Sequence, residues 1–226
     1  MQQPSAAERD GTSRRGRRSG VEAAQTRLRV VCAALAVFAD QGYAATSLRD
    51  IATDAGVAHG LVRHHFSSKD GLWRAAVNFA VDRATAVLRP YIPPAQGDAA
   101  DAVEQARGAI RAVLEVNARH PELARLLMHE GVRGGAHFLY ALEHYAEVGD
   151  QMAPLLDRVR TAGHLRAFDN RGLFLFVLTG GVAPLVLPAL SAWILRTPEL
   201  SEAQQREHIE RVVGLLLPAE SPGEVS

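Results

Sequence analysis

The chain has 226 residues, of which 47% are hydrophobic and 22% are charged, and its 25 basic and 25 acidic side chains leave no formal net charge. This composition excludes an intrinsically disordered chain and predicts a folded core. A single cysteine excludes an internal disulfide framework and a metal site of the CxxC type. The polar, Arg-rich N-terminus lacks the apolar stretch of a signal peptide, so the sequence predicts a cytoplasmic protein.

Charge is divided unevenly along the chain. Residues 1–75 carry 11 basic and 7 acidic side chains, whereas residues 76–226 carry 14 basic and 18 acidic ones. A net charge of +4 on the first part and −4 on the remainder favours a polyanionic partner for the first part, although an imbalance of this size is also common in proteins that bind nothing charged.

Residues 1–20 show no helical or strand periodicity and are rich in Gln, Pro, Ser, Gly and Arg. This composition predicts a disordered arm. The basic cluster from Arg14 to Arg18 either contacts DNA phosphates or a minor groove, or only keeps the chain soluble, and the sequence leaves both interpretations open.

From Glu22 the apolar residues recur every three or four positions, which predicts a helix that ends near Gly42. Cys32 lies on the apolar stripe, so we expect a buried and unreactive thiol. Tyr43, directly after the helix, is expected to fill the core.

Two short helices follow. Ser47 and Asp50 have the spacing of a capping box at the start of the first one. Gly56 lies in the turn before the second, which runs from about Ala58 to Phe66. Two helices of this length joined by a glycine-containing turn indicate a helix-turn-helix, whose second helix fits a DNA major groove.

A longer helix is predicted from about residue 69 to residue 89. Ser67 or Ser68 caps its start, and the prolines at 90, 93 and 94 end it.

Over about residues 22–75 the sequence resembles, in order and without gaps, the DNA-binding domain of the TetR/AcrR family of bacterial repressors. The resemblance is carried by Gly42-Tyr43-Ala44-Ala45-Thr46-Ser47-Leu48-Arg49-Asp50-Ile51-Ala52, by Ala55-Gly56-Val57, by Gly60, and by His65-Phe66-Ser67-Ser68-Lys69-Asp70-Gly71-Leu72.

The resemblance implies a recognition helix near residues 58–66, with Val57, Val62 and Phe66 facing the core. In the family, hydroxyls before the second helix and a lysine after the recognition helix contact phosphate. The residues implied to contact DNA are Thr46, Ser47, Ala58, His59, Gly60, Leu61, Arg63, His64, His65 and Lys69.

Two residues depart from the family pattern. Ala58 stands where Ser or Thr is usual, so the recognition helix loses a side-chain cap. Arg63 stands where Tyr is usual, and an arginine can contact phosphate or the O6 and N7 atoms of guanine, which is worth about 1–3 kcal/mol of discrimination. Because adjacent residues of a helix point about 100° apart, His64 and His65 are not expected to bind a metal.

The rest of the chain predicts further helices at about residues 99–119, 121–130 and 137–162, and a last one that a capping box at Ser201 and Gln204 begins. The expected fold is all-α with about nine helices. A disordered arm (1–20) precedes a three-helix DNA-binding domain (21–75), a helical ligand-binding and dimerisation domain (76–218) and a disordered tail (219–226).

Residues 172–195 contain no charge and are long enough to span a membrane. Gly180-Gly181, Pro184 and Pro188 divide them into shorter pieces, however. The resemblance implies that the last two helices pair with those of a second subunit, so we expect a homodimer through about residues 171–216 and no membrane partner.

The resemblance also implies a ligand-operated repressor that binds a palindromic double-stranded operator and is released by a small-molecule inducer. The side chains that mix aromatic surface with polar tips, as ligand sites do, are Met128, His129, Phe138, Tyr140, His144, Tyr145 and Phe174. They predict a mainly apolar ligand, or they are ordinary core residues.

Other functions are less well supported by the sequence. It contains no GxSxG, HExxH, Walker or GxGxxG motif, so we expect neither an enzyme nor a cofactor or metal. An alternative is a helix-turn-helix protein whose head is degenerate and acts through protein–protein contacts. The sequence does not distinguish a repressor from an activator.

Overall fold

The computed structural model describes residues 6–92, 98–196 and 200–218. Within these ranges the chain forms helices and turns and no strand, which confirms the all-α prediction. The described part contains eleven α-helices rather than about nine, mainly because the uncharged segment breaks into several pieces. The chain divides into two compact units, Met1–Ala76 and Val77–Ser226, and each is described by itself.

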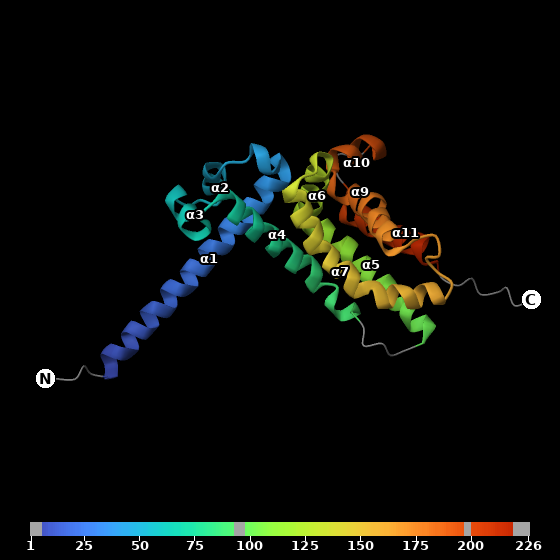
Figure 1. The fold of residues 1–226 in the computed structure, drawn as a ribbon, viewed down its shortest axis with the longest axis horizontal. Coiled ribbons are helices and arrows are strands. Elements are labelled where there is room, and N and C mark those ends of the chain that lie inside the picture. The colour runs from blue at the N-terminus through green and yellow to red at the C-terminus, as the bar shows by residue number, and fades with distance from the viewer. Residues whose placement is uncertain (1–5, 93–97, 197–199, 219–226) are drawn as a thin grey trace, which may run out of the picture. The chain divides into compact units, whose positions relative to one another are not determined.

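The first unit contains α1 (Ala6–Ala45), α2 (Leu48–Asp54), α3 (His59–Phe66) and the start of α4 (Lys69–Ala86) (Figure 1). Its core is built from one apolar stripe of each helix. The side chains of Phe38, Ile51, Val62 and Trp73 are all completely buried, and the Phe38 and Trp73 rings meet edge to face with centroids 4.9 Å apart.

Helix α1 begins at Ala6, whereas the sequence predicts a disordered arm through residue 20. The helix extends toward the N-terminus through three glycines, which disfavour a helix, but no proline lies between Pro4 and Pro90 to end it. Residues 1–5 of the predicted arm lie outside the described ranges. At the other end of α1, Gly42 has a non-helical φ of 77°.

Two core predictions in α1 and after it have different outcomes. Cys32 is exposed, so the prediction of a buried thiol is wrong. The core is filled instead by its neighbours Val30, Val31, Ala34 and Leu35. Cys32 lies at the edge of this apolar stripe and faces the solvent. Tyr43 does pack on the core, with its ring centroid 5.3 Å from that of Trp73.

The second unit begins within α4. It contains a 3₁₀ turn η1 (Arg89–Tyr91), α5 (Ala99–Arg119), α6 (Glu122–Arg133), α7 (Ala136–Thr161), α8 (Asn170–Phe176), a π-helix η2 (Val177–Val182), α9 (Ala183–Val186), α10 (Pro188–Leu195) and α11 (Glu202–Leu216). The predicted capping box at Ser201 and Gln204 is confirmed, and Pro154 lies inside α7. The predicted tail, 219–226, lies outside the described residues.

Helix α5 is central to the second unit and packs against α7, α11 and the π-helix. It is also joined to α11 by Arg111, which donates two hydrogen bonds to the carboxylate of Glu210 at 2.6 and 2.9 Å. These bonds hold the pKa of Glu210 below its ordinary value.

The uncharged segment forms a bent helical rod, that is, two helical parts joined at a sharp bend. Its two parts, Asn170–Val186 and Pro188–Leu195, meet at 83°. The bend is fixed by Arg125, which donates to the Val186 carbonyl oxygen at 2.7 Å, and by buried Ser191, which donates to the Pro184 carbonyl oxygen at 2.7 Å.

By length and composition, this bent pair and residues 20–45 of α1 are the described segments that could cross a bilayer. In the most apolar window of the α1 segment, 44% is buried, as in the core helix of a folded domain.

The π-helix lies in the middle of the rod. Gly181 faces α5 there, and a Cβ on Gly181 would lie 2.8 Å from Cδ2 of Leu114. The Gly181 carbonyl oxygen accepts a hydrogen bond from Nε2 of His208 on α11 at 2.8 Å. A backbone group of the π-helix is thus satisfied by a side chain from another helix.

Candidate nucleic-acid interface and ligand site

Helices α2 and α3 are joined by a tight and fully hydrogen-bonded turn. Ser47 and Asp50 form the predicted capping box at the start of α2. At its end, the N–H groups of Gly56 and Val57 donate to the carbonyl oxygens of Thr53 and Ala52, which is the Schellman arrangement. Gly56 has a φ of 64°, a conformation that a side chain disfavours, so glycine suits this turn.

The two hydroxyl groups before α2 lie in different environments. Ser47 is exposed. Thr46 is buried, and its hydroxyl donates to the Gly42 carbonyl oxygen at 2.8 Å, so it ties the end of α1 to the start of α2. The structure therefore differs from the prediction of two phosphate-contacting hydroxyls, because only Ser47 has an accessible one.

Helix α3 separates its residues by face. Val62 and Phe66 are buried in the first unit, as predicted, whereas Val57 is only half-buried. The exposed members of the predicted DNA-contacting set in this helix and at its N-cap are Ala58, His59, Gly60, Arg63 and His64, while Leu61 and His65 are half-buried.

The exposed face of α3 carries positive charge and free donors. The helix contains no acidic residue, and no described residue forms an ion pair with Arg63. Ala58 provides no side-chain cap, as its departure from the family pattern predicts. The first backbone N–H groups of α3 are therefore left without a side-chain acceptor, and such groups favour a phosphate.

Lys69 is the only lysine of the chain and the first residue of α4. Its Nζ atom donates to the Ala44 carbonyl oxygen at 3.3 Å and lies 4.4 Å from the centroid of the Tyr43 ring. Partial burial lowers the pKa of Lys69, and burial together with Asp70 raises the pKa of Tyr43. The ammonium group is thus held in place at the end of α1 rather than free in solvent.

Two further basic residues of the first unit lack a role in the sequence prediction. Arg27 of α1 places its guanidinium 5.1 Å from the centroid of the Phe66 ring, which brings a positive charge to the end of α3. Arg49 on α2 is exposed and has no ion-pair partner among the described residues. A helical wheel of α2 could have identified Arg49, but the contact between Arg27 and Phe66 depends on the tertiary fold.

The residues predicted to bind a ligand fall into separate groups on the helices of the second unit. The Tyr145 and Phe174 rings pack with centroids 5.2 Å apart, and burial raises the pKa of Tyr145 to about 12. Phe138 packs over Gly131, next to the α6 residues Met128 and His129. Neither the hollow beside Arg160–Arg171 nor the cleft beside α4 is lined by all of these side chains together.

The third group, Tyr140 and His144, lies beside a cleft, and His144 lines it. Tyr140 donates to Oδ1 of Asn78 at 2.8 Å, and the Tyr140 and His144 ring centroids lie 4.1 Å apart. Beside this pair, a cleft of about 360 Å³ separates the second part of α4 from α7. It is lined by Asn78, Val81, Asp82, Thr85, Arg89, Ile92, His144 and Gln151.

In the first unit, two short helices meet at a tight turn, and the second exposes a basic face without acidic residues. These features define a helix-turn-helix nucleic-acid-binding domain.

The sequence comparisons agree with this class. Residues 31–76 match the family model described as "Bacterial regulatory proteins, tetR family". The HTH-type transcriptional repressor Rv3405c of Mycobacterium tuberculosis is 35% identical over 130 residues. That match covers 53% of this chain and 65% of the relative, which is less than two thirds of its length.

The fold is also shared with solved structures. The ketosteroid transcriptional regulator KstR2 of Mycobacterium tuberculosis aligns with a TM-score of 0.62 at 20% identity, over 84% of this chain and 92% of that one. AibR in complex with isovaleryl coenzyme A and operator DNA aligns with a TM-score of 0.64 at 18% identity, over 85% of this chain and 98% of that one. Residues 31–76 are therefore similar to the TetR family of bacterial regulatory proteins, and the described chain shares the fold of these two solved regulators.

Proposed function

We propose that the chain is a dimeric, ligand-responsive regulator, most simply a repressor, that reads a two-fold related operator with α3. The observation that carries the proposal is the face of α3, where His59, Gly60, Arg63 and His64 are exposed while Val62 and Phe66 anchor the helix in the core. An exposed helix of this kind fits a major groove.

Within this proposal the polar and basic residues of the head have two roles. Ser47, Lys69, Arg27 and Arg49 contact phosphates and fix the position of the head, since such contacts carry no base information. Arg63 contacts guanine, because its guanidinium can donate to O6 and N7 together. Thr46 supports the head from inside through its bond to Gly42.

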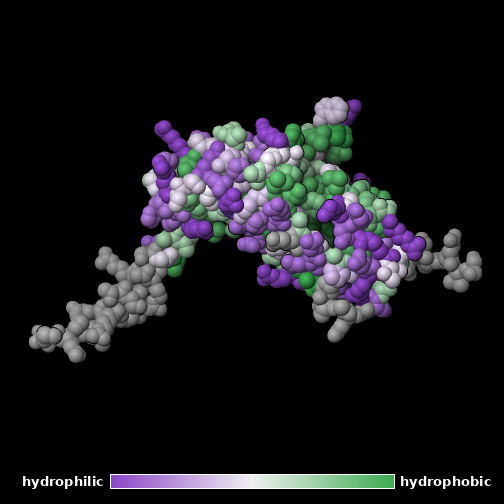
Figure 2. Space-filling view, viewed as in Figure 1, coloured by the Kyte–Doolittle hydropathy of each residue, from purple (hydrophilic) through white to green (hydrophobic). Residues whose placement is uncertain are grey.

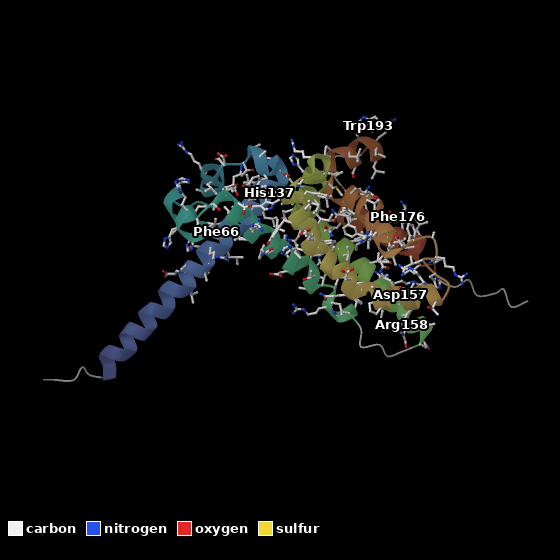
Figure 3. The ribbon with its side chains drawn as sticks, viewed as in Figure 1. Phe66, His137, Asp157, Arg158, Phe176 and Trp193 are labelled. Carbon is white, nitrogen blue, oxygen red and sulfur yellow. The ribbon has the colours of Figure 1, made fainter. Side chains whose placement is uncertain are left out.

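Dimerisation would use the C-terminal helices. Large apolar side chains stay exposed on α8, α10 and α11: Leu175, Leu190, Trp193, Ile194, Leu195 and Leu215. The apolar surface is visible over α10, where Trp193 projects (Figures 2 and 3). Such a surface marks an interaction site, and a second copy of the chain would place two α3 helices about 34–36 Å apart, in successive major grooves.

A structural relative supports the ligand response. AibR was solved in complex with isovaleryl coenzyme A and operator DNA, so a protein of this fold can bind both a small molecule and DNA. For this chain, a ligand in the second unit would have to bind the DNA-incompetent state more tightly in order to release the operator. Within this proposal the protein works in the cytoplasm and without a membrane partner.

The proposal is tested by selecting bound duplexes from a random library and measuring fluorescence anisotropy on the selected site at about 0.15 M salt. We expect a two-fold related site bound about a thousandfold or more over random DNA, and Arg63→Gln should reduce this preference at one base pair of each half-site. Weak binding without sequence preference would refute the proposal and favour a head that contacts proteins. A monomer by light scattering would refute the dimer.

A further inference from the structure

The cleft between α4 and α7 is bordered by two polar stripes. On the α4 side, Asn78, Asp82 and Thr85 follow one another at spacings of four and three residues, which places them on one face of the helix. Arg89 of η1 continues this polar lining just beyond the end of α4. Two helices that pack on each other normally interdigitate apolar side chains. Here polar side chains border a hollow, and only Val81 and Ile92 give it an apolar floor.

One hydrogen bond joins the two helices at the start of the cleft. It links Tyr140 and Asn78, which lie 62 positions apart in the sequence. Helices α4 and α7 run in the same direction from this bridge (Figure 1), so the same offset brings Asp82, one turn farther along α4, to the height of His144 on α7. Arg89 of η1 and Gln151 lie farther along, and all four of these side chains line the cleft.

The part of the cleft lined by Asp82 and His144 offers hydrogen-bond acceptors. Nδ1 of His144 lies 2.9 Å from the Tyr140 carbonyl oxygen, which can only accept, so Nδ1 carries the proton. In the neutral ring, Nε2 is then an acceptor. The carboxylate of Asp82 is exposed and forms no ion pair with a described residue. A carboxylate and an imidazole nitrogen together suit an ammonium group.

The level of Arg89 and Gln151 offers donors. The Arg89 guanidinium is exposed and forms no ion pair with a described residue. A guanidinium binds a carboxylate through two parallel hydrogen bonds, and the Gln151 amide can add a third. Arg89 is the first residue of the turn η1, just beyond the end of α4, and lies seven residues after Asp82. At about the rise of a helix, seven residues correspond to about 10 Å.

We propose that the cleft between α4 and α7 binds a small zwitterion whose ammonium group lies at Asp82 and His144 and whose carboxylate lies at Arg89, about 10 Å away. The volume of about 360 Å³ lies within the range of small-molecule sites. The ligand is thus polar at both ends, not mainly apolar as the aromatic residues of the sequence suggest. Its regulatory effect rests on the proposed function, but its binding does not.

Trialanine is a suitable probe, because three extended residues span about 10 Å between an ammonium and a carboxylate group. Calorimetric titration of the full chain without DNA should show binding of trialanine. N-acetyl-trialanine, trialanine amide and single alanine should each bind at least about tenfold more weakly, since one charge-assisted contact is lost in each.

The variants assign the two ends. Asp82→Asn should remove the preference for trialanine over its N-acetyl form, and Arg89→Gln should remove the preference over the amide. Glu115→Gln and Arg119→Gln, which break an exposed ion pair of α5 outside the cleft, are matched controls and should keep both preferences. All four changes lie at surface positions, and circular dichroism checks that each variant folds.

Three results would overturn the inference: no binding of trialanine, equal binding of the blocked peptides, or unchanged preferences in both cleft variants. The outcome is separable from that of the proposed function. A chain that binds a selected duplex but no trialanine refutes only the cleft, and a chain that binds trialanine but no duplex refutes only the regulator.

Discussion

Substituting Gly60 with alanine should change stability and DNA binding in opposite directions. Gly60 is exposed in the first turn of α3, and a Cβ built on it meets no atom within 4 Å. The fold therefore does not require glycine at this position. Since alanine favours a helix over glycine by about 0.5–1 kcal/mol, Gly60→Ala should raise the free energy of unfolding of the first unit by that amount.

The same methyl group should weaken DNA binding. If α3 lies in a major groove, the absence of a side chain at Gly60 lets its backbone approach the bases or phosphates closely. A methyl group there would separate the two surfaces, and we expect operator affinity to fall at least about tenfold, which is about 1.4 kcal/mol.

The two tryptophans make the stability measurement specific. Trp73 is completely buried in the first unit, whereas Trp193 in the second unit is 82% exposed. In a Trp193→Phe background, Trp73 fluorescence during urea denaturation reports the first unit alone. Ala58→Ser is the matched control in the same turn: a side-chain cap should add about 1 kcal/mol of stability without weakening DNA binding.

Each outcome for Gly60→Ala tests a different premise. A destabilised free chain would show that the described environment of Gly60 is wrong. A stabilised chain with unchanged operator affinity would show that this face of α3 does not approach DNA.

Three further predictions concern other sites. Gly181→Ala should lower the free energy of unfolding of the second unit by about 1–3 kcal/mol in chemical denaturation, because its methyl group would overlap Leu114. Gly180→Ala is the control and should have a much smaller effect, because its Cβ would be no closer than 3.6 Å to a neighbour. Equal effects of the two substitutions would contradict the packing. Since burial raises the pKa of Tyr145 to about 12, the folded chain keeps a proton that the unfolded chain releases near pH 10. The free energy of unfolding should then fall between about pH 10 and 12 by at most about 1.4 kcal/mol per pH unit, and an unchanged slope in Tyr145→Phe would refute this. Lys69→Gln should reduce the slope of log K against log salt for DNA binding by about 0.9, and an unchanged slope would mean that Lys69 contacts no phosphate.

The helix-turn-helix was predictable because its determinants are local. Ser47, Asp50 and Gly56 act within a few residues of themselves, so the caps and the turn can be derived from spacing alone. The burial of Thr46 and the exposure of Cys32 were not predictable in this way. Both residues lie at the edge of an apolar stripe, where a small rotation about the helix axis decides whether a side chain faces the core or the solvent.

The candidate ligand site was less predictable, because it depends on contacts between distant elements. The sequence identified Tyr140 and His144 from residue type. It missed Asp82 and Arg89, since exposed polar residues along one segment indicate a binding site only when a second helix is known to lie beside them. The extended α1 was missed for another reason: the glycines and serines before residue 20 suggest disorder, and no local signal in the sequence marks a helix there.

The π-helix has a consequence for the evolution and engineering of the second unit. Its wider turns hold one more residue than the same length of α-helix would need. Removing one residue between Val177 and Val182 would therefore restore an unbroken α-helix instead of breaking one. Because about five α-helical residues turn the chain as far as the six of this π-helix, everything that follows would keep its orientation. Trp193 and its neighbours on α10 would still point the same way, so a single deletion at this place could be accepted without re-aiming the apolar surface of the protein.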